Sequence, residues 1–167
     1  MAYGLNLMKN LGMGEVRYPN AVSIAITKKG ANSMSKETKK ILSVCIQNAS
    51  RSQMAQGFAE AFGKGRVEVY SAGSRPSSQI NPLAIEAMKE KGIDLSGRRP
   101  KGLNDLPPVE MDYLVTMGCE ATCPAIPARK IIEWAIPDPK GKPMDEIRRI
   151  RDMLEAKVKA LLEDVES

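Results

Sequence analysis

The sequence predicts an α/β protein with a single-domain, three-layer αβα architecture built around a four-stranded parallel sheet. Short apolar runs typical of buried strands alternate along the chain with segments whose apolar residues recur at helical spacing. The 167 residues, 43% hydrophobic and 27% charged, suit one globular domain with a sizeable core. Ligands of such sheets bind beyond the carboxyl ends of the strands. We therefore expect the loops after Val44, Met117 and Ile136 to meet there.

The first half of the domain alternates between the two element types. Residues 41–44 form an apolar run typical of a buried strand, and residues 51–62 carry five apolar side chains at helical spacing: Met54, Ala55, Phe58, Ala59 and Phe62. Residues 66–71 alternate apolar and polar side chains, which suits a strand nearer an edge of the sheet. A second helix is expected after Asn81, with Pro82 in its first turn and Gly92 at its end.

The second half completes the sheet and adds a long helix. Residues 97–110, with their glycine, asparagine and paired prolines, are expected to form a loop. Residues 113–117 and 130–136 read as the third and fourth strands. Residues 144–165 predict an amphipathic helix with one apolar stripe made of Ile147, Ile150, Leu154, Val158, Leu161 and Val165.

Residues 1–33 lack a sustained helical or strand period, so we expect an N-terminal extension outside the core. Residues 34–167 then read as a complete catalytic domain. An upstream start codon or an engineered leader would explain the preceding residues. The alternative is that residues 21–27 form an edge strand packed on the domain.

The composition excludes much chemistry. The chain contains no histidine, which rules out Ser-His and Cys-His nucleophiles, histidine proton shuttles and histidine-containing zinc sites. Its three cysteines are too few for an all-cysteine zinc site. Their odd number, without a secretory leader, argues against a disulfide framework. We expect reduced or redox-active thiols in the cytoplasm, no metal and no tightly bound cofactor.

The net charge of +5 lies entirely in residues 1–40, so the remainder of the chain is electrically neutral overall. A nucleic-acid surface requires a basic face or stripe, and none is predicted for the body of the protein. No apolar stretch is long enough to cross a membrane. We expect a monomer without nucleic-acid or membrane partners.

The loop after the first strand carries the chemistry. Cys45 and Arg51 are separated by five residues between a strand and a helix, and Ser52 follows directly. Loop amides, the helix N-terminus and the Arg51 guanidinium can converge there on a tetrahedral oxyanion. The same field favours a Cys45 thiolate. The predicted oxyanion-binding residues are Ile46, Gln47, Asn48, Ala49, Ser50, Arg51 and Ser52. Asn48 tolerates the left-handed backbone that such a loop needs, and Ser52 can donate to the sulfur.

This pattern, together with an aspartate in Ile136-Pro-Asp138-Pro, resembles the low-molecular-weight protein tyrosine phosphatase fold. More specifically, it is similar to the thioredoxin-coupled arsenate reductases built on that fold. The resemblance covers residues 40 to about 163. It includes Ser71-Ala-Gly73, the run Thr116-Met-Gly-Cys-Glu-Ala-Thr-Cys-Pro124, and Arg148-Arg-Ile-Arg-Asp152.

The resemblance implies a role for each residue. Cys45 would be the nucleophile, Arg51 the oxyanion clamp and Asp138 the general acid. Cys119 and Cys123 would be a redox pair recycled by thioredoxin, and the order in which they attack is open. Arsenate would be the substrate, with phosphate or sulfate as competing oxyanions.

Two other classes of function remain open on the sequence. A phosphatase acting on phosphotyrosine or small phosphomonoesters would use Cys45, Arg51 and Asp138 in the same roles. Its relatives tend to carry a tyrosine after Asp-Pro, whereas Lys140-Gly141 stands here, and the cysteine pair would have no purpose. A non-enzymatic oxyanion or redox sensor is the third reading. All three cysteines could also be structural thiols, since cysteine is often buried.

Overall fold

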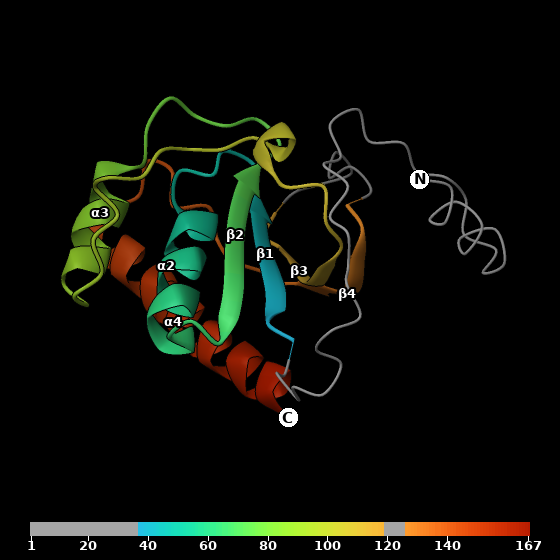
Figure 1. Ribbon diagram of the computed structural model, residues 1–167. Helices are drawn as coiled ribbons and strands as arrows, with labels where there is room; N and C mark the ends of the chain where they lie inside the picture. Colours follow the sequence, from blue (N-terminus) through green and yellow to red (C-terminus); the bar gives the residue numbers. More distant parts are fainter. Residues whose placement is uncertain (1–36, 119–125) are drawn as a thin grey trace, which may run out of the picture. The chain divides into compact units, whose positions relative to one another are not determined.

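The computed structural model describes residues 37–118 and 126–167, in which strands and helices alternate (Figure 1). The elements are β1 (Lys39–Cys45), α2 (Arg51–Gly63), β2 (Val67–Gly73), α3 (Pro82–Lys89), the 3-10 helix η1 (Leu103–Asp105), β3 (Met111–Thr116), β4 (Ala128–Glu133) and α4 (Met144–Glu166). The predicted extension over residues 1–33, Cys119 and Cys123 lie outside the described residues.

The four strands form one parallel sheet in the order β2-β1-β3-β4. The chain leaves β1 for β2 on one side and then crosses to β3 on the other. The carboxyl end of β1 is therefore the point at which the strand order reverses, the usual ligand position in open α/β sheets. There Cys45 pairs with Gly73 of β2, and Val44 pairs with Thr116 of β3. The predicted fold class is confirmed.

Alternation along β1 divides the core between the two faces of the sheet. Ile41 and Cys45 belong to the larger cluster, which includes Phe58 of α2, Met88 of α3 and Leu154 of α4. These three helices gather on one side of the sheet in Figure 1. Leu42 and Val44 belong to a second cluster that packs against Leu103 and Leu106, in and beside η1. Among the described residues this second face is thus covered by a 3-10 helix and loops.

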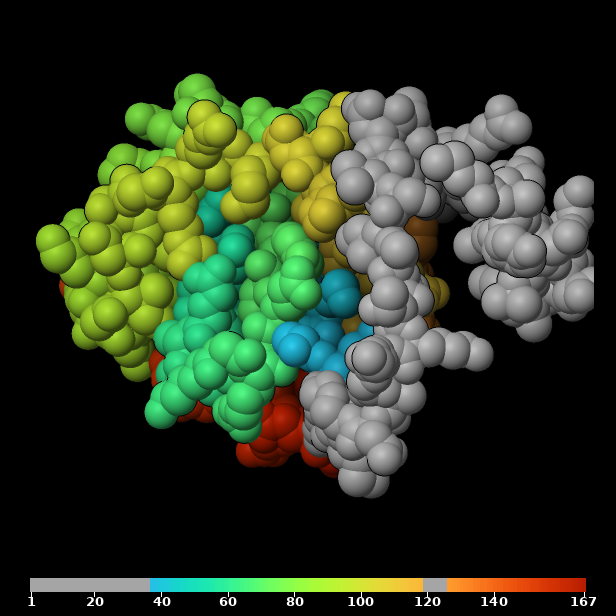
Figure 2. Space-filling model, viewed as in Figure 1, coloured from blue at the N-terminus to red at the C-terminus, as the bar shows by residue number. Residues whose placement is uncertain are grey.

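The edge strands differ from each other. Strand β2 was predicted to lie near an edge, does so, and reaches the surface beside α2 in Figure 2. Strand β4 forms the other edge and ends at Glu133, whereas the sequence predicted a strand over 130–136. Its partner β3 ends at Thr116, which pairs with Glu133, so the ladder has no further partner. Trp134 and Ile136 are buried in the larger cluster without being part of the strand.

Local signals place the helix ends as expected. The Asn81 side chain accepts a hydrogen bond of 3.0 Å from the Leu83 N–H, and Pro82 occupies the first turn of α3. Asp145 and Glu146 lie in the first turn of α4, where negative charge complements the helix dipole. Within residues 37–118 and 126–167, no helix has both the length and the apolar character that a membrane crossing requires.

Candidate active site

The five-residue loop between β1 and α2 encloses a cavity of about 120 Å³. Cys45 is the last residue of β1 and Arg51 the first of α2, so the predicted spacing spans the gap between a strand end and a helix start. The cavity is lined by Cys45, Ile46, Gln47, Ala49, Ser50, Arg51, Asp138 and Lys140. Of the predicted oxyanion-binding residues, Asn48 and Ser52 are fully buried and do not line it.

The segment 74–81 fixes the orientation of the loop backbone. Its N–H groups donate to four loop carbonyls: Ser74 to Cys45 at 3.3 Å, Arg75 to Ile46 at 2.8 Å, Ser77 to Gln47 at 3.0 Å and Asn81 to Ala49 at 2.8 Å. In a trans peptide the N–H points opposite to the preceding carbonyl. The N–H groups that follow these carbonyls are therefore turned away from segment 74–81, which is the polarity that an anion site requires.

Two donors surround the Cys45 sulfur. The Asn48 backbone N–H donates to Sγ at 3.2 Å, and Ser52 Oγ lies 2.9 Å from Sγ. Ser52 Oγ itself accepts from the Asn48 side-chain amide at 2.8 Å, which leaves the Ser52 hydroxyl hydrogen available for the sulfur. The buried Cys45 sulfur thus has two hydrogen-bond partners and lies in the loop that leads into the N-terminus of α2.

The Asn48 side chain stabilises the conformation of the loop. Its φ of 50° is left-handed, as the residue type suggested. Its side-chain oxygen accepts from Gln53 Nε2 and from the Lys101 backbone N–H, both at 2.8 Å. Half-burial lowers the pKa of the Lys101 side chain, with a smaller contribution from Arg98. This support could not be predicted from the sequence, because Lys101 lies in a segment without periodicity, 53 residues after Asn48.

Arg51 and Asp138 meet across the mouth of the cavity. Arg51 is buried and donates from Nη1 to the Ile136 carbonyl at 3.1 Å. Its Nη2 lies 4.0 Å from Asp138 Oδ1, and the Asp138 side chain is 61% exposed. A methyl group at Gly118, which ends the described part of the chain before Cys119, would lie 2.8 Å from Arg51 Nη1. The chain after β3 therefore passes directly beside the guanidinium.

The described residues bring Cys45, Arg51 and Asp138 together, whereas Cys119 and Cys123 lie outside them. Within the described part of the chain, no group of three or more cysteine, aspartate or glutamate side chains is placed to hold a metal ion. The arrangement can bind a tetrahedral oxyanion, attack it with sulfur and protonate a departing oxygen.

An α/β sheet that carries a Cys-x5-Arg loop at its switch point defines a class of oxyanion-binding thiol proteins. The family model described as low molecular weight phosphotyrosine protein phosphatase matches residues 40–167, and the chain belongs to this family. The fold resemblance noted in the sequence is thereby confirmed.

Within this family, several proteins named as arsenate reductases are similar to this chain. Arsenate reductase 1 of Staphylococcus epidermidis is 38% identical over 125 residues, covering 73% of this chain and 94% of that protein. A solved arsenate reductase in the phosphate binding state is 32% identical with a TM-score of 0.70, covering 76% of this chain and 98% of that one. The thioredoxin-dependent arsenate reductase of Corynebacterium glutamicum is 30% identical with a TM-score of 0.65, and the match covers 79% of this chain and 64% of that one. The more specific resemblance to arsenate reductases is confirmed as well.

Proposed function

We propose that this protein is a thiol-dependent arsenate reductase that uses Cys45 as its nucleophile in the cytoplasm, where thiols stay reduced. The observation that carries the proposal is the Cys45 sulfur with two hydrogen-bond partners in a cavity that Arg51 and Asp138 also line. The names of the similar proteins support arsenate as the oxyanion.

The first step displaces one oxygen of arsenate by sulfur. The Cys45 thiolate attacks arsenic while Arg51 and the loop amides stabilise the negative charge on the remaining oxygens. Asp138 donates its proton to the departing oxygen, which leaves as water. An S–As bond forms, an As–O bond breaks, and arsenic is still in the +5 state.

The second step transfers two electrons from thiols to arsenic. Cys119 attacks the sulfur of Cys45, which releases arsenite and leaves a Cys45–Cys119 disulfide. Cys123 then attacks Cys119, frees Cys45 and presents a Cys119–Cys123 disulfide to thioredoxin. The passage of Gly118 beside Arg51 supports this relay, since Cys119 follows Gly118 in the sequence. The thioredoxin dependence of the Corynebacterium glutamicum protein supports the reductant.

The rival reading is a phosphatase that uses Cys45, Arg51 and Asp138 in the same way, with water completing the reaction. An aromatic phosphoester is bound best by aromatic walls. No aromatic side chain is among the described residues that line the cavity. This lining favours a small inorganic oxyanion over phosphotyrosine.

The relay is tested by measuring arsenite release with thioredoxin, thioredoxin reductase and NADPH, beside hydrolysis of p-nitrophenyl phosphate. Cys45→Ser should abolish both reactions. Arg51→Lys should lose most of both because an ammonium cannot replace the planar guanidinium fork, whereas Arg149→Lys, exposed on α4, is the matched control. Wild-type turnover in Cys45→Ser would contradict the nucleophile.

The distal cysteines separate the two enzyme readings. Cys123→Ser should release about one arsenite per chain and stall as a Cys45–Cys119 disulfide, because only the last exchange is missing. Cys119→Ser should release almost none, and both variants should keep any phosphatase activity. Mass spectrometry of protein that has been treated with arsenate and then alkylated distinguishes the Cys45–Cys119 disulfide from free thiols. Multiple turnovers in the Cys119→Ser, Cys123→Ser double variant would refute the relay.

A further inference from the structure

A second hollow adjoins the oxyanion cavity. It measures about 200 Å³ and shares Gln47, Ser50, Asp138 and Lys140 with its neighbour. Three of its other lining residues, Ser77, Gln79 and Asn81, are polar, and the remaining three are Ile80, Pro82 and Gly141. Lys140 therefore lies where the two spaces join, and no role has yet been assigned to it.

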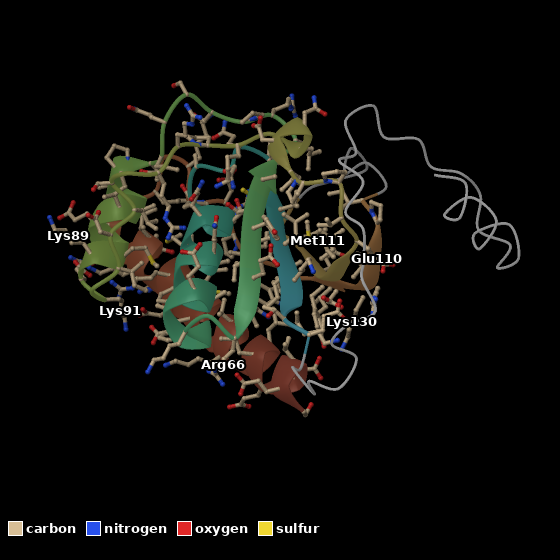
Figure 3. The ribbon with its side chains drawn as sticks, viewed as in Figure 1. Arg66, Lys89, Lys91, Glu110, Met111 and Lys130 are labelled. Carbon is tan, nitrogen blue, oxygen red and sulfur yellow. The ribbon has the colours of Figure 1, made fainter. Side chains whose placement is uncertain are left out.

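The side-chain charges that line the oxyanion cavity indicate that Lys140 contributes to the attraction of anions. Among the described residues the lining has two cations, Arg51 and Lys140, and one carboxyl group, Asp138. With Cys45 as a thiolate and Asp138 protonated for its acid role, the four side chains sum to one positive charge. Without Lys140 the sum is zero, so these side chains would give a doubly charged oxyanion no net long-range attraction. Two other lysines are paired elsewhere: Figure 3 shows Lys91 below α3 and Lys130 beside β4, and their ammonium groups lie 3.0 Å from Glu155 and 2.9 Å from Asp164 of α4.

The backbone fixes Lys140 at this place. Its N–H donates to Asp138 Oδ1 at 3.0 Å, and the Lys142 N–H donates to the Pro139 carbonyl at 3.1 Å. Pro139 is buried and anchors the turn, whereas Lys140 is exposed on it. Because the contact to Asp138 uses backbone atoms, a change of the Lys140 side chain leaves the general acid in position.

We propose that Lys140 is a substrate-binding residue that makes the site selective for doubly charged over singly charged tetrahedral oxyanions. The inference rests on the proposed function for the identity of the substrate, but not for the existence of the anion site. Charge attraction of this kind acts on binding in the ground state and the transition state alike. It weakens as salt screens it.

The test compares Lys140→Gln with Lys142→Gln, which removes the same charge two residues along the same turn. Sulfate and perchlorate serve as probes, because both are tetrahedral and they carry two charges and one. Each is titrated for protection of Cys45 against iodoacetamide, read by mass spectrometry. In Lys140→Gln the protective concentration of sulfate should rise about threefold to tenfold and that of perchlorate less than about twofold. Lys142→Gln should match the wild type.

Steady-state kinetics give the second readout. In Lys140→Gln the KM for arsenate should rise by the same factor as the protective concentration of sulfate. The kcat should stay within about twofold, and the difference should shrink at high salt. Lys140→Arg keeps the charge and should restore binding, which controls for a folding defect. Equal loss for sulfate and perchlorate, or unchanged sulfate protection, would overturn the proposal for Lys140. If the wild type selects sulfate over perchlorate but does not reduce arsenate, only the proposed function is overturned.

Discussion

Gly73, the last residue of β2, lies against the loop that follows β1. A Cβ atom there would be 2.6 Å from the Ile46 carbonyl oxygen and 2.8 Å from the Asn48 nitrogen. Both are backbone atoms of the oxyanion loop, and such distances cannot be relieved by turning a side chain. Asn48 also donates to the Cys45 sulfur, so a displaced loop would move the donor away from the nucleophile.

Gly73→Ala is therefore expected to lower turnover at least tenfold and to destabilise the fold by about 1–3 kcal/mol, the usual effect of overpacking. Gly97→Ala is the matched control, because nothing lies within 4 Å of a Cβ at Gly97. Urea unfolding and arsenate turnover measure the two effects. Wild-type kinetics in Gly73→Ala would show that the loop tolerates displacement.

The residues of the site differ in how well their positions can be predicted from the sequence. Cys45 and Arg51 are brought together by a local strand, loop and helix, so their spacing was enough to anticipate a shared cavity. The left-handed Asn48 followed from its residue type. The supports of the loop could not be found in this way. Lys101 reaches the loop through a tertiary contact from a segment that has no local pattern, whereas the position of Gly118 beside Arg51 agrees with the expectation that the loop after Met117 approaches the one after Val44.

At the scale of elements, hydrophobic periodicity was reliable where a segment is buried on one side. Helices α2 and α4 begin where their apolar spacing begins and end within a residue of the prediction. The predicted end of β4 at residue 136 was wrong because the apolar residues Trp134 and Ile136 were taken for strand positions. They are buried by packing on the helices, and a strand ends where its hydrogen-bonding partner ends.

Ion pairs join α3 to α4 around Glu90. Arg148 Nη2 donates to Glu90 Oε1 at 2.8 Å and Arg151 Nη1 to Oε2 at 2.6 Å. Hydrogen bonds from Arg148, then Arg151, lower the pKa of Glu90 from 4.5 to about 2. A lowered carboxyl pKa adds stability above pH 4.5, and this stability is lost as the pH falls toward 2.

The Tm difference between the wild type and Glu90→Gln should accordingly be constant above about pH 5 and shrink between pH 4.5 and 2. Glu163→Gln, an exposed change on α4, controls for the loss of a negative charge. Thermal unfolding followed by circular dichroism across this range measures the difference. A Tm difference that grows on acidification would contradict the assignment of the ion pairs.

At the scale of the whole molecule, the described hydrophobic clusters and cavity lining lie within residues 37–118 and 126–167. Strand β1 begins at Lys39, and its neighbours β2 and β3 pair with both of its edges. Residues 1–33 carry four basic residues and one glutamate, so a chain that begins at Met34 loses three of the five net positive charges. A chain that begins at Met34 keeps every residue of the described hydrophobic clusters and of the described cavity lining.

A chain that begins at Met34 is expected to fold with a Tm within about 2 °C of the full chain and to keep its kcat and its KM for arsenate at physiological salt. At low salt its KM should rise slightly, since the missing charges attract anions only over the distance that ions leave unscreened. Thermal unfolding and steady-state kinetics at two ionic strengths measure both effects. A Tm lower by about 4–8 °C, equivalent to about 1 kcal/mol or more, would favour the alternative in which residues 21–27 pack on the domain as a strand. Unchanged Tm with lost turnover would place part of the active site in the extension.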